Sequence, residues 1–204
     1  MKIIGITGTL GAGKGTIVEF LKEKGFKHFS ARDFLIKEIK RRGMEANRDS
    51  MTIVANDLRE KNSPSYILDE LYRKAEAEGQ NSVLESIRTA GEVKSLRIKG
   101  DFTLLAVDAN QKTRYKRIIK RDSITDKVSF EKFKFDEKRE MKSADPNKQN
   151  LSICKEMADF VIMNDGTIEE LKMKIEEILE EPLIANGKFS KEERRKKIEE
   201  TLVK

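Results

Sequence analysis

Short apolar runs bounded by glycine or polar residues recur along the chain and predict buried β-strands. The first run, residues 2–7, is rich in isoleucine and leads into a glycine-rich loop. Runs of this length are short for helices, and turn residues on both sides favour strands. The predicted strands cover residues 2–7, 26–29, 82–84, 102–107 and 160–163.

Segments with apolar residues at helical spacing lie between these runs. In residues 16–24, for example, Ile17, Phe20 and Leu21 share one helical face. Thr167, with Glu170 three residues later, predicts a capping box at the start of the last amphipathic segment. The predicted helices cover residues 16–24, 31–42, 49–61, 64–78, 110–121, 151–158 and 167–180.

The alternation of strands and helices predicts a three-layer α/β fold with a central parallel sheet of about five strands. One domain is expected over residues 1–181, and it includes a lid over about residues 122–146. The lid is polar and charged, and its bulky anchors are Phe130, Phe133 and Phe135. We therefore interpret it as a partly helical cover.

The composition changes after residue 181. Residues 182–204 contain a turn at Asn186-Gly187 and then a charged, helical pattern. Its basic run at 194–197 is interrupted on both sides by glutamates, which is more typical of a solvated helix than of contact with a partner or with nucleic acid. We interpret residues 182–204 as a charged helical appendage.

Composition narrows the class of protein. Charged residues make up 38% and hydrophobic residues 37% of the 204 residues, and the net charge is +6. Basic and acidic residues are mixed along the chain, so a nucleic-acid partner is not expected. The chain has no run of about 18 apolar residues and no secretory signal pattern, which predicts no membrane span and a cytoplasmic location.

Cys154 is the only cysteine and His28 the only histidine. A single thiol cannot form an internal disulfide, which fits a reducing compartment. The apolar neighbours of Cys154 favour a buried structural thiol over a catalytic Cys–His pair.

The segment 8–16 lies between the first predicted strand and the first predicted helix, which is the setting of a P-loop. Its glycines let backbone N–H groups converge on phosphate oxygens, and Lys14 adds a mobile positive charge. The segment predicts binding of ATP with Mg²⁺. Gly15 stands at the usual Ser/Thr position and cannot bind the metal, so Thr16 or water is expected to do so. The predicted nucleotide-binding residues are Gly8, Thr9, Leu10, Gly11, Ala12, Gly13, Lys14, Gly15 and Thr16.

The sequence Gly-Ala-Gly-Lys-Gly-Thr at 11–16 resembles the P-loop of adenylate kinase and other nucleoside monophosphate kinases. Residues 83–88, 117–122 and 158–171 resemble dephospho-CoA kinase and an archaeal group related to it. The resemblance covers about residues 1–180. It implies a P-loop kinase that moves the γ-phosphoryl group of ATP, with Mg²⁺, to an acceptor.

The resemblance also implies roles at the carboxyl ends of the strands, where ligands bind in parallel sheets. Glu85 corresponds to an aspartate that organises the metal, and Arg88 to an arginine that holds the acceptor's phosphate. Asp33 is a candidate for acceptor binding or for a general base, and Asn164 for a contact with the nucleotide base. Each also has a structural interpretation: a helix-capping acid for Glu85 and Asp33, a surface ion pair for Arg88, and a turn residue for Asn164.

Arg114, Arg117 and Arg121 are spaced three and four residues apart, so they share one helical face. Phosphoryl transfer spreads negative charge over the γ-phosphate oxygens, and arginines near the lid stabilise that charge in the resembling families. Arg117 and Arg121 are therefore candidate catalytic residues, together with Lys14. The alternative is a solvated basic face.

Two hypotheses for function remain open at this point. The first is an ATP-dependent phosphotransferase acting on a nucleotide-like acceptor, such as a nucleoside or deoxynucleoside monophosphate or dephospho-CoA. The second is a nucleotide-binding regulatory or switch protein with little turnover. Three departures from the resembling families favour it: Gly15 at the usual Ser/Thr position, Arg32 where adenylate kinases have a glycine, and Glu85 where an aspartate is usual. A phosphate acceptor would depend on Arg88, whereas a hydroxyl acceptor would depend on Asp33 as a base.

Overall fold

The computed structural model describes residues 1–121 and 128–180. Its centre is a five-stranded sheet in the order β2-β3-β1-β4-β5, in which every neighbouring pair is parallel. The strands are β1 (Ile3–Gly8), β2 (Lys27–Ser30), β3 (Ser82–Glu85), β4 (Phe102–Asp108) and β5 (Phe160–Met163). The predicted three-layer α/β fold with a parallel sheet is confirmed.

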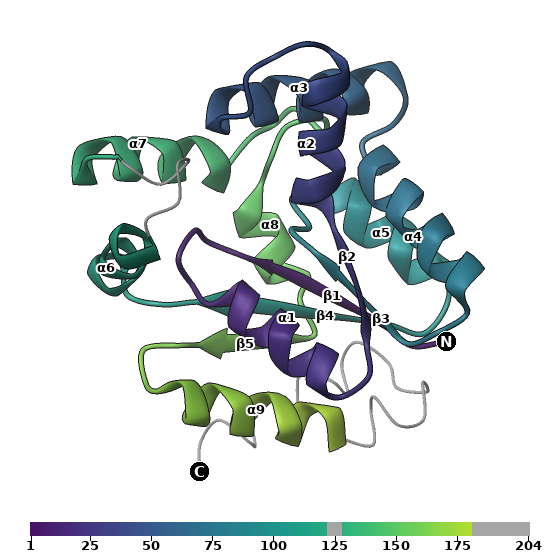
Figure 1. Cartoon of the computed structure of the whole chain (residues 1–204), viewed down its shortest axis with the longest axis vertical. Coiled ribbons are helices and arrows are strands. Elements are labelled where there is room, and N and C mark those ends of the chain that lie inside the picture. Colours follow the sequence, from purple (N-terminus) through teal and green to yellow (C-terminus); the bar gives the residue numbers. More distant parts are fainter. Residues whose placement is uncertain (122–127, 181–204) are drawn as a thin grey trace.

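Helices connect the strands and cover the sheet (Figure 1). The first half of the chain forms α1 (Lys14–Glu23), α2 (Ala31–Arg41), α3 (Arg48–Lys61), α4 (Tyr66–Glu78) and α5 (Ala90–Ile98). The second half forms α6 (Gln111–Arg121), α7 (Phe130–Met141), α8 (Leu151–Glu156) and α9 (Ile168–Glu180). No described helix is long and apolar enough to cross a membrane.

The two faces of the sheet bury separate hydrophobic cores because successive strand residues point to opposite faces. Ile3 and Leu104 belong to the core shared with α2, α3, α4, α5 and α8. Ile4 and Leu105, their neighbours in sequence, belong to the core shared with α1 and α9. Because all five strands are parallel, their carboxyl ends lie at one edge of the sheet, and the loops of the site lie there.

The predicted elements agree with the structure to within about two residues at most boundaries. Thr167 and Glu170 form the predicted capping box, with reciprocal hydrogen bonds of 3.2 and 3.1 Å. The helix α5 was not predicted. Val93 and Leu96 are its buried apolar residues, and Ile98 is exposed, so its hydrophobic period is too short to read from the sequence.

The described part of the segment predicted as a lid contains α7, which we call the lid helix after that prediction. Phe133 is buried, and its ring lies with those of Tyr115 and Phe130 in a cluster with centroid separations of 5.0 to 6.2 Å. Phe135 is 62% exposed, so its prediction as an anchor was wrong. It lies on the face of α7 opposite the buried residues. The predicted appendage at 182–204 and the start of the lid at 122–127 lie outside the described residues.

Candidate functional site

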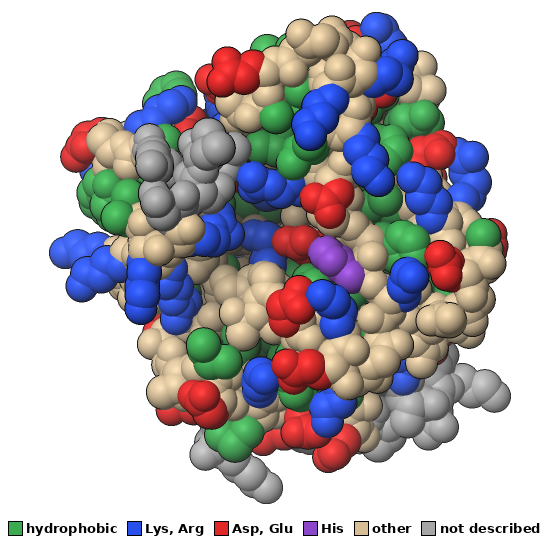
Figure 2. Space-filling model, in the orientation of Figure 1, with side chains coloured by type: hydrophobic (Ala, Val, Ile, Leu, Met, Phe, Trp, Pro, Cys, Tyr) green, Lys and Arg blue, Asp and Glu red, His purple; other side chains and the backbone are tan. Residues whose placement is uncertain are grey.

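A cleft of about 560 Å³ opens at the carboxyl edge of the sheet. Figure 2 shows this hollow beside His28, with lysine and arginine side chains gathered in it. Its walls come from segments that are far apart in the sequence: the P-loop, β3 and the residues after it, α2, α3, α6, and the start of α9. The cleft has a P-loop end, built from residues 10–16, and a second end that we call the acceptor chamber. The acceptor chamber is lined by Leu35, Arg48, Met51, Ala55, Arg59, Ile67, Arg88 and Gln149.

Lys14 lies at the start of α1 and is buried at the P-loop end. Its Nζ donates to the backbone oxygens of Gly8, at 3.0 Å, and Thr9, at 2.8 Å, so the lysine closes the loop on itself. Burial lowers the pKa of Lys14 from 10.5 to about 7, and the nearby charges of Arg88 and Arg121 act in the same direction. A bound polyphosphate would supply the negative charge that this ammonium lacks.

Asn164 and Gly13 fit against each other beneath the P-loop. Asn164 is buried, and its Nδ2 donates to the oxygen of Ala12 at 2.8 Å. Gly13 has a φ of 109°, and a Cβ on it would lie 2.3 Å from Asn164 Nδ2. Glycine is therefore required at position 13 both by its backbone conformation and by the lack of space. Asn164 lines the cleft, and its bond to Ala12 also makes it a brace of the loop.

The other side of the P-loop is held by Asp108 at the end of β4. Thr9 Oγ1 donates to Asp108 Oδ1 at 2.7 Å, and Lys155 Nζ donates to Oδ2 at 3.0 Å. Burial opposes ionisation of Asp108, yet these hydrogen bonds hold its pKa below the usual range. Among the predicted P-loop residues, Gly8, Thr9 and Ala12 thus shape the loop, while Leu10, Gly11, Gly13, Lys14, Gly15 and Thr16 line the cleft.

Glu85 ends β3 and lines the cleft together with Thr16. Burial opposes its ionisation, but His28 and the charge of Lys14 hold the pKa of Glu85 below its usual range. The Nε2 atom of His28 lies 3.3 Å from Glu85 Oε2, close enough for attraction but without an aligned hydrogen bond. Ser86, the next residue, has a φ of 71°, which is strained for a residue with a side chain and turns the chain sharply at the cleft wall.

An ionised Glu85 and the Thr16 hydroxyl fit a Mg²⁺ ion that is bound mainly by phosphate oxygens. Among the described residues, no group of three or more His, Cys, Asp or Glu side chains could hold a metal by itself. Mg²⁺ commonly takes one or two protein oxygens and completes its shell with water and substrate phosphates. This donor set agrees with that pattern.

The three arginines predicted on one face of α6 separate into two roles. Arg117 and Arg121 line the cleft, and Arg117 Nη1 donates to the oxygen of Asn164 at 2.9 Å. Arg114 is buried, and it donates to the oxygens of Ala109, at 2.8 Å, and Leu10, at 3.3 Å, and to Glu137 of α7. Arg114 therefore links the P-loop to the lid helix and does not line the cleft.

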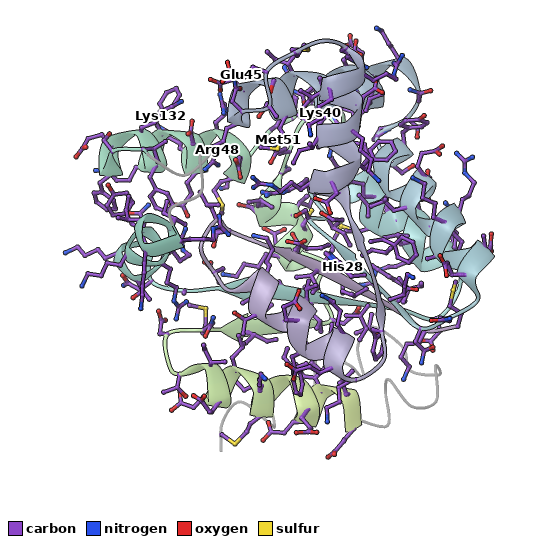
Figure 3. The ribbon with its side chains drawn as sticks, in the orientation of Figure 1. His28, Lys40, Glu45, Arg48, Met51 and Lys132 are labelled. Atoms are coloured by element: carbon purple, nitrogen blue, oxygen red, sulfur yellow. The ribbon has the colours of Figure 1, made fainter. Side chains whose placement is uncertain are left out.

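Arg88 and Arg48 meet on a carboxylate of the lid helix. Arg88 Nη1 donates to Glu140 Oε2 at 2.8 Å, and Arg48 Nη2 donates to Oε1 at 2.8 Å. Figure 3 shows Arg48 at the end of α3 that faces α7, with Met51 beside it. Burial opposes ionisation of Glu140, but the charges of Arg88 and Arg48 hold its pKa below the usual range. The Glu140 carboxylate thus pairs with two of the guanidinium groups that line the cleft.

Arg59 and Glu92 form an ion pair at the inner end of the acceptor chamber, and both are buried. Nε and Nη2 of Arg59 donate to Glu92 Oε1 at 3.1 and 2.9 Å. The other oxygen of Glu92 accepts from the backbone N–H groups of Arg88, at 2.6 Å, and Thr89, at 3.0 Å. Glu92 therefore orients Arg59 and the backbone of Arg88 together.

Two predicted residues lie away from the cleft chemistry. Asp33 is exposed in the first turn of α2, its N–H donates to Ser30 Oγ at 3.2 Å, and it is not among the described residues that line the cleft. Ser30, and not Asp33, caps this helix. Cys154 is buried as predicted, and burial raises the pKa of its thiol to about 12, so it is no nucleophile at neutral pH.

Several residues of the acceptor chamber were not found from the sequence. Arg48, Ala55 and Arg59 lie on one face of α3 and line the chamber. In the sequence, the two arginines look like scattered surface charges. Glu140 does carry a signal, because Phe133, Asp136 and Glu140 are spaced three and four residues apart and are all buried. A phenylalanine on the same face as two acids indicates a buried charged contact.

Comparisons with known proteins agree with this fold. The AAA domain family matches residues 4–145. A UPF0200 protein of Sulfurisphaera tokodaii is 30% identical over 88% of this chain and 96% of its own length. Two solved structures share the fold. The structure of TT1252 from Thermus thermophilus has a TM-score of 0.57 and 20% identity, over 87% of this chain and 96% of that one. A shikimate kinase from Bacteroides thetaiotaomicron has a TM-score of 0.53 and 15% identity, over 88% of this chain and 98% of that one.

Both solved structures are similar in fold alone, since each is far from this chain in sequence. The family match at residues 4–145 includes the P-loop and the strands β1 to β4. The fold is that of P-loop kinases, and it supports nucleotide binding in general terms. By the extent of these matches, the chain belongs to the AAA domain family and, among curated proteins, to the UPF0200 family.

Proposed function

We propose that this protein is an ATP-dependent phosphotransferase that moves the γ-phosphoryl group to a nucleotide-like acceptor. The observation that carries the proposal is the continuity of the cleft. One hollow joins the P-loop, the arginines of α6 and the acceptor chamber, so a donor and an acceptor can lie in contact. Holding two reactants in line is the main requirement of phosphoryl transfer.

Each part of the cleft supports one requirement of this reaction. The P-loop amides and Lys14 hold the phosphates of ATP, and Mg²⁺ held by Thr16 and Glu85 would neutralise their charge. Arg117 and Arg121 line the same cleft and would stabilise the charge that develops on the γ-phosphoryl group. Asn164 lines the donor end and is a candidate for contact with the nucleotide base.

The acceptor end supports a phosphate acceptor over a hydroxyl. Arg88 lines the cleft, and its charge helps to lower the pKa of Lys14, which supports a role for Arg88 in binding a phosphate near the P-loop. A phosphate monoester has a second pKa of about 6 and is ionised at neutral pH, so it needs a cation rather than a base. Asp33, the candidate base, is exposed and is not among the described cleft residues.

The test is ADP production by the full chain with ATP and Mg²⁺ over a panel of acceptors. The panel contains the nucleoside and deoxynucleoside monophosphates and dephospho-CoA. With the best acceptor, Arg88→Ala is expected to lower kcat/KM by about 100-fold or more, because a charge-assisted pair is lost, whereas Asp33→Asn stays within about threefold. A severe Asp33→Asn effect would indicate a hydroxyl acceptor. ATP binding without turnover on any acceptor would favour the regulatory alternative.

A further inference from the structure

Three residues of the acceptor chamber carry a buried polar atom that lacks a hydrogen-bond partner among the described residues. These atoms are Nη1 of Arg48, Nη1 of Arg59 and Oε1 of Gln149. Buried polar groups in folded proteins are nearly always paired, because an unpaired one destabilises the fold. Within the described chain, no side chain of the P-loop has such an atom. The unmet hydrogen bonds of the cleft are therefore concentrated at its acceptor end.

Arg59 presents its unpaired donor in a fixed direction. The side chain is 3% exposed, and its planar guanidinium is held by Glu92 through Nε and Nη2. The hydrogens of Nη1 therefore point away from Glu92. A buried ion pair adds little to stability compared with apolar residues of the same size. What the pair provides is a rigid hydrogen-bond donor next to the cleft.

The acceptor chamber has an apolar part beside its charged groups. Met51 and Ala55 precede Arg59 at four-residue spacing on α3 and share its face, and Leu35 and Ile67 line the same chamber. A ligand that fills this part therefore buries flat or apolar surface there and presents polar atoms to Arg59 and Gln149 at its edge. A sugar or polyol would leave hydroxyl groups against these apolar side chains, at a desolvation cost.

We infer that the acceptor carries a planar nitrogen heterocycle whose edge is read by Arg59 and Gln149, an inference that rests on the phosphotransfer function proposed above. Arg59 Nη1 donates to a carbonyl oxygen or ring nitrogen, and Gln149 Oε1 accepts from a ring N–H or amino group. The ring lies against Met51, Leu35 and Ile67. Arg48 and Arg88 are left for the phosphate of the same acceptor. Arg59 and Gln149 are thus specificity-determining residues of the acceptor site.

The test is calorimetric binding of the nucleoside 5′-monophosphates and of ribose 5-phosphate to the full chain. Ribose 5-phosphate has the phosphate but no heterocycle. The wild type is expected to bind its best nucleotide about 100-fold more tightly than ribose 5-phosphate, at about tenfold for each hydrogen bond. Gln149→Leu and Arg59→Lys are each expected to reduce this ratio about tenfold, with little change in ribose 5-phosphate affinity.

Matched controls separate recognition from folding. Gln80 is exposed and lies outside the cleft, so Gln80→Leu should keep the ratio of nucleotide to ribose 5-phosphate affinity. Arg97 pairs with Asp159 outside the cleft, so Arg97→Lys should keep this ratio too. Gln149→Leu removes an oxygen that has no partner among the described residues, so the melting temperature of the protein should not change. If Arg59→Lys does not fold, the Gln149→Leu variant alone is sufficient for the test.

A wild type that binds ribose 5-phosphate as tightly as every nucleotide overturns the inference, as does an unchanged ratio in Gln149→Leu. The phosphotransfer proposal can fail separately. Selective nucleotide binding without ADP production on any acceptor rejects phosphotransfer and keeps the recognition site. ADP production on an acceptor that has no heterocycle keeps phosphotransfer and rejects the recognition site.

Discussion

The two ends of the cleft are built in opposite ways. At the P-loop end, one continuous segment supplies the binding groups, and Thr9, Lys14 and Asn164 are all hydrogen-bonded within the protein. In the acceptor chamber, the lining side chains come from α2, α3, α4, the residues after β3 and the residues before α8. Three of those side chains keep an unpaired polar atom, and two share a lid carboxylate.

This difference reflects two kinds of recognition. A phosphate group is the same in every nucleotide, so a short loop of backbone N–H groups recognises it in a local, pre-formed way. An acceptor is recognised by shape and by the pattern of its polar edge, which requires side chains from several elements at once. At the P-loop end, no described side chain has an unpaired buried polar atom, whereas the acceptor chamber has three that a ligand could pair.

The largest expected effect lies between the two ends, at the arginines of α6. Arg117→Ala and Arg121→Ala should each lower kcat about 10³-fold with ATP affinity within about threefold, because they act on charge that develops only in the transition state. Steady-state kinetics and calorimetric ATP titrations measure both quantities. Lys120→Ala, on an exposed position of the same helix, is the control. Turnover within about threefold of the wild type in both arginine variants would assign them to a solvated face.

The next effect is the pH dependence of ATP affinity at the P-loop end. Free Lys14 has a pKa of about 7 instead of 10.5, and bound phosphates raise it, so ATP binding takes up a proton above about pH 7. Between pH 7 and pH 9 the protonated fraction of free Lys14 falls from about one half to about one hundredth, which weakens ATP binding about 50-fold. The phosphates remain ionised over this range.

Calorimetry in buffers of different ionisation enthalpy measures this proton uptake directly. Lys14→Met is the control, since it removes the titrating group and with it the pH dependence. At Lys14 the unfolded chain binds more protons than the folded one above pH 7, whereas the raised pKa of the buried Cys154 thiol has the opposite effect above pH 9. The stability of the ligand-free protein should therefore rise with pH between pH 7 and pH 9. An ATP affinity that is flat from pH 7 to pH 9 would contradict the lowered pKa.

A smaller effect tests the paired charges of the acceptor chamber. Glu140→Gln removes the carboxylate that Arg88 and Arg48 share, so inorganic phosphate should bind about tenfold more tightly. Isothermal titration at fixed ionic strength measures this, and thermal unfolding should show that phosphate restores the stability lost by the variant. Glu131→Gln, on an exposed position of α7, is the matched control. Weaker phosphate binding in Glu140→Gln would mean that Glu140 positions the arginines instead of competing with the ligand.

The smallest effect concerns Gly15, which stands where a P-loop usually has serine or threonine. A Cβ at Gly15 would meet nothing within 4 Å, and its backbone is helical, so Gly15→Ser should stabilise the protein by about 0.5 kcal/mol. Gly13→Ser is the contrasting variant, because its φ is 109° and its Cβ would meet Asn164. We expect Gly13→Ser to lose at least about 1 kcal/mol of stability. Chemical denaturation measures both, and a destabilised Gly15→Ser would show that glycine is required there too.

The sequence alone was sufficient for the fold and for the position of the glycine-rich loop between β1 and α1, because the signals there are local. Strand runs such as 102–107 and helical spacing such as Ile17, Phe20 and Leu21 follow directly from burial on one face. The glycines and Lys14 at 8–16 are adjacent in the chain, so their geometry is set by neighbouring residues. Helix α5 was missed because its local signal is weak: few of its residues are buried and apolar.

The tertiary structure alone decided which polar side chains share the acceptor chamber. Asp33 and Arg114 have the same kind of sequence signal as Arg88 and Arg117. Yet Asp33 lies on the exposed side of α2, and Arg114 binds Glu137 of the lid helix. Arg48, Arg59, Glu140 and Gln149 are separated by up to about a hundred residues and meet only because α3, α7 and the start of α8 fold over the same edge of the sheet. Periodicity shows which face of a helix is buried, but the charge on a buried face is explained only by the group that it meets.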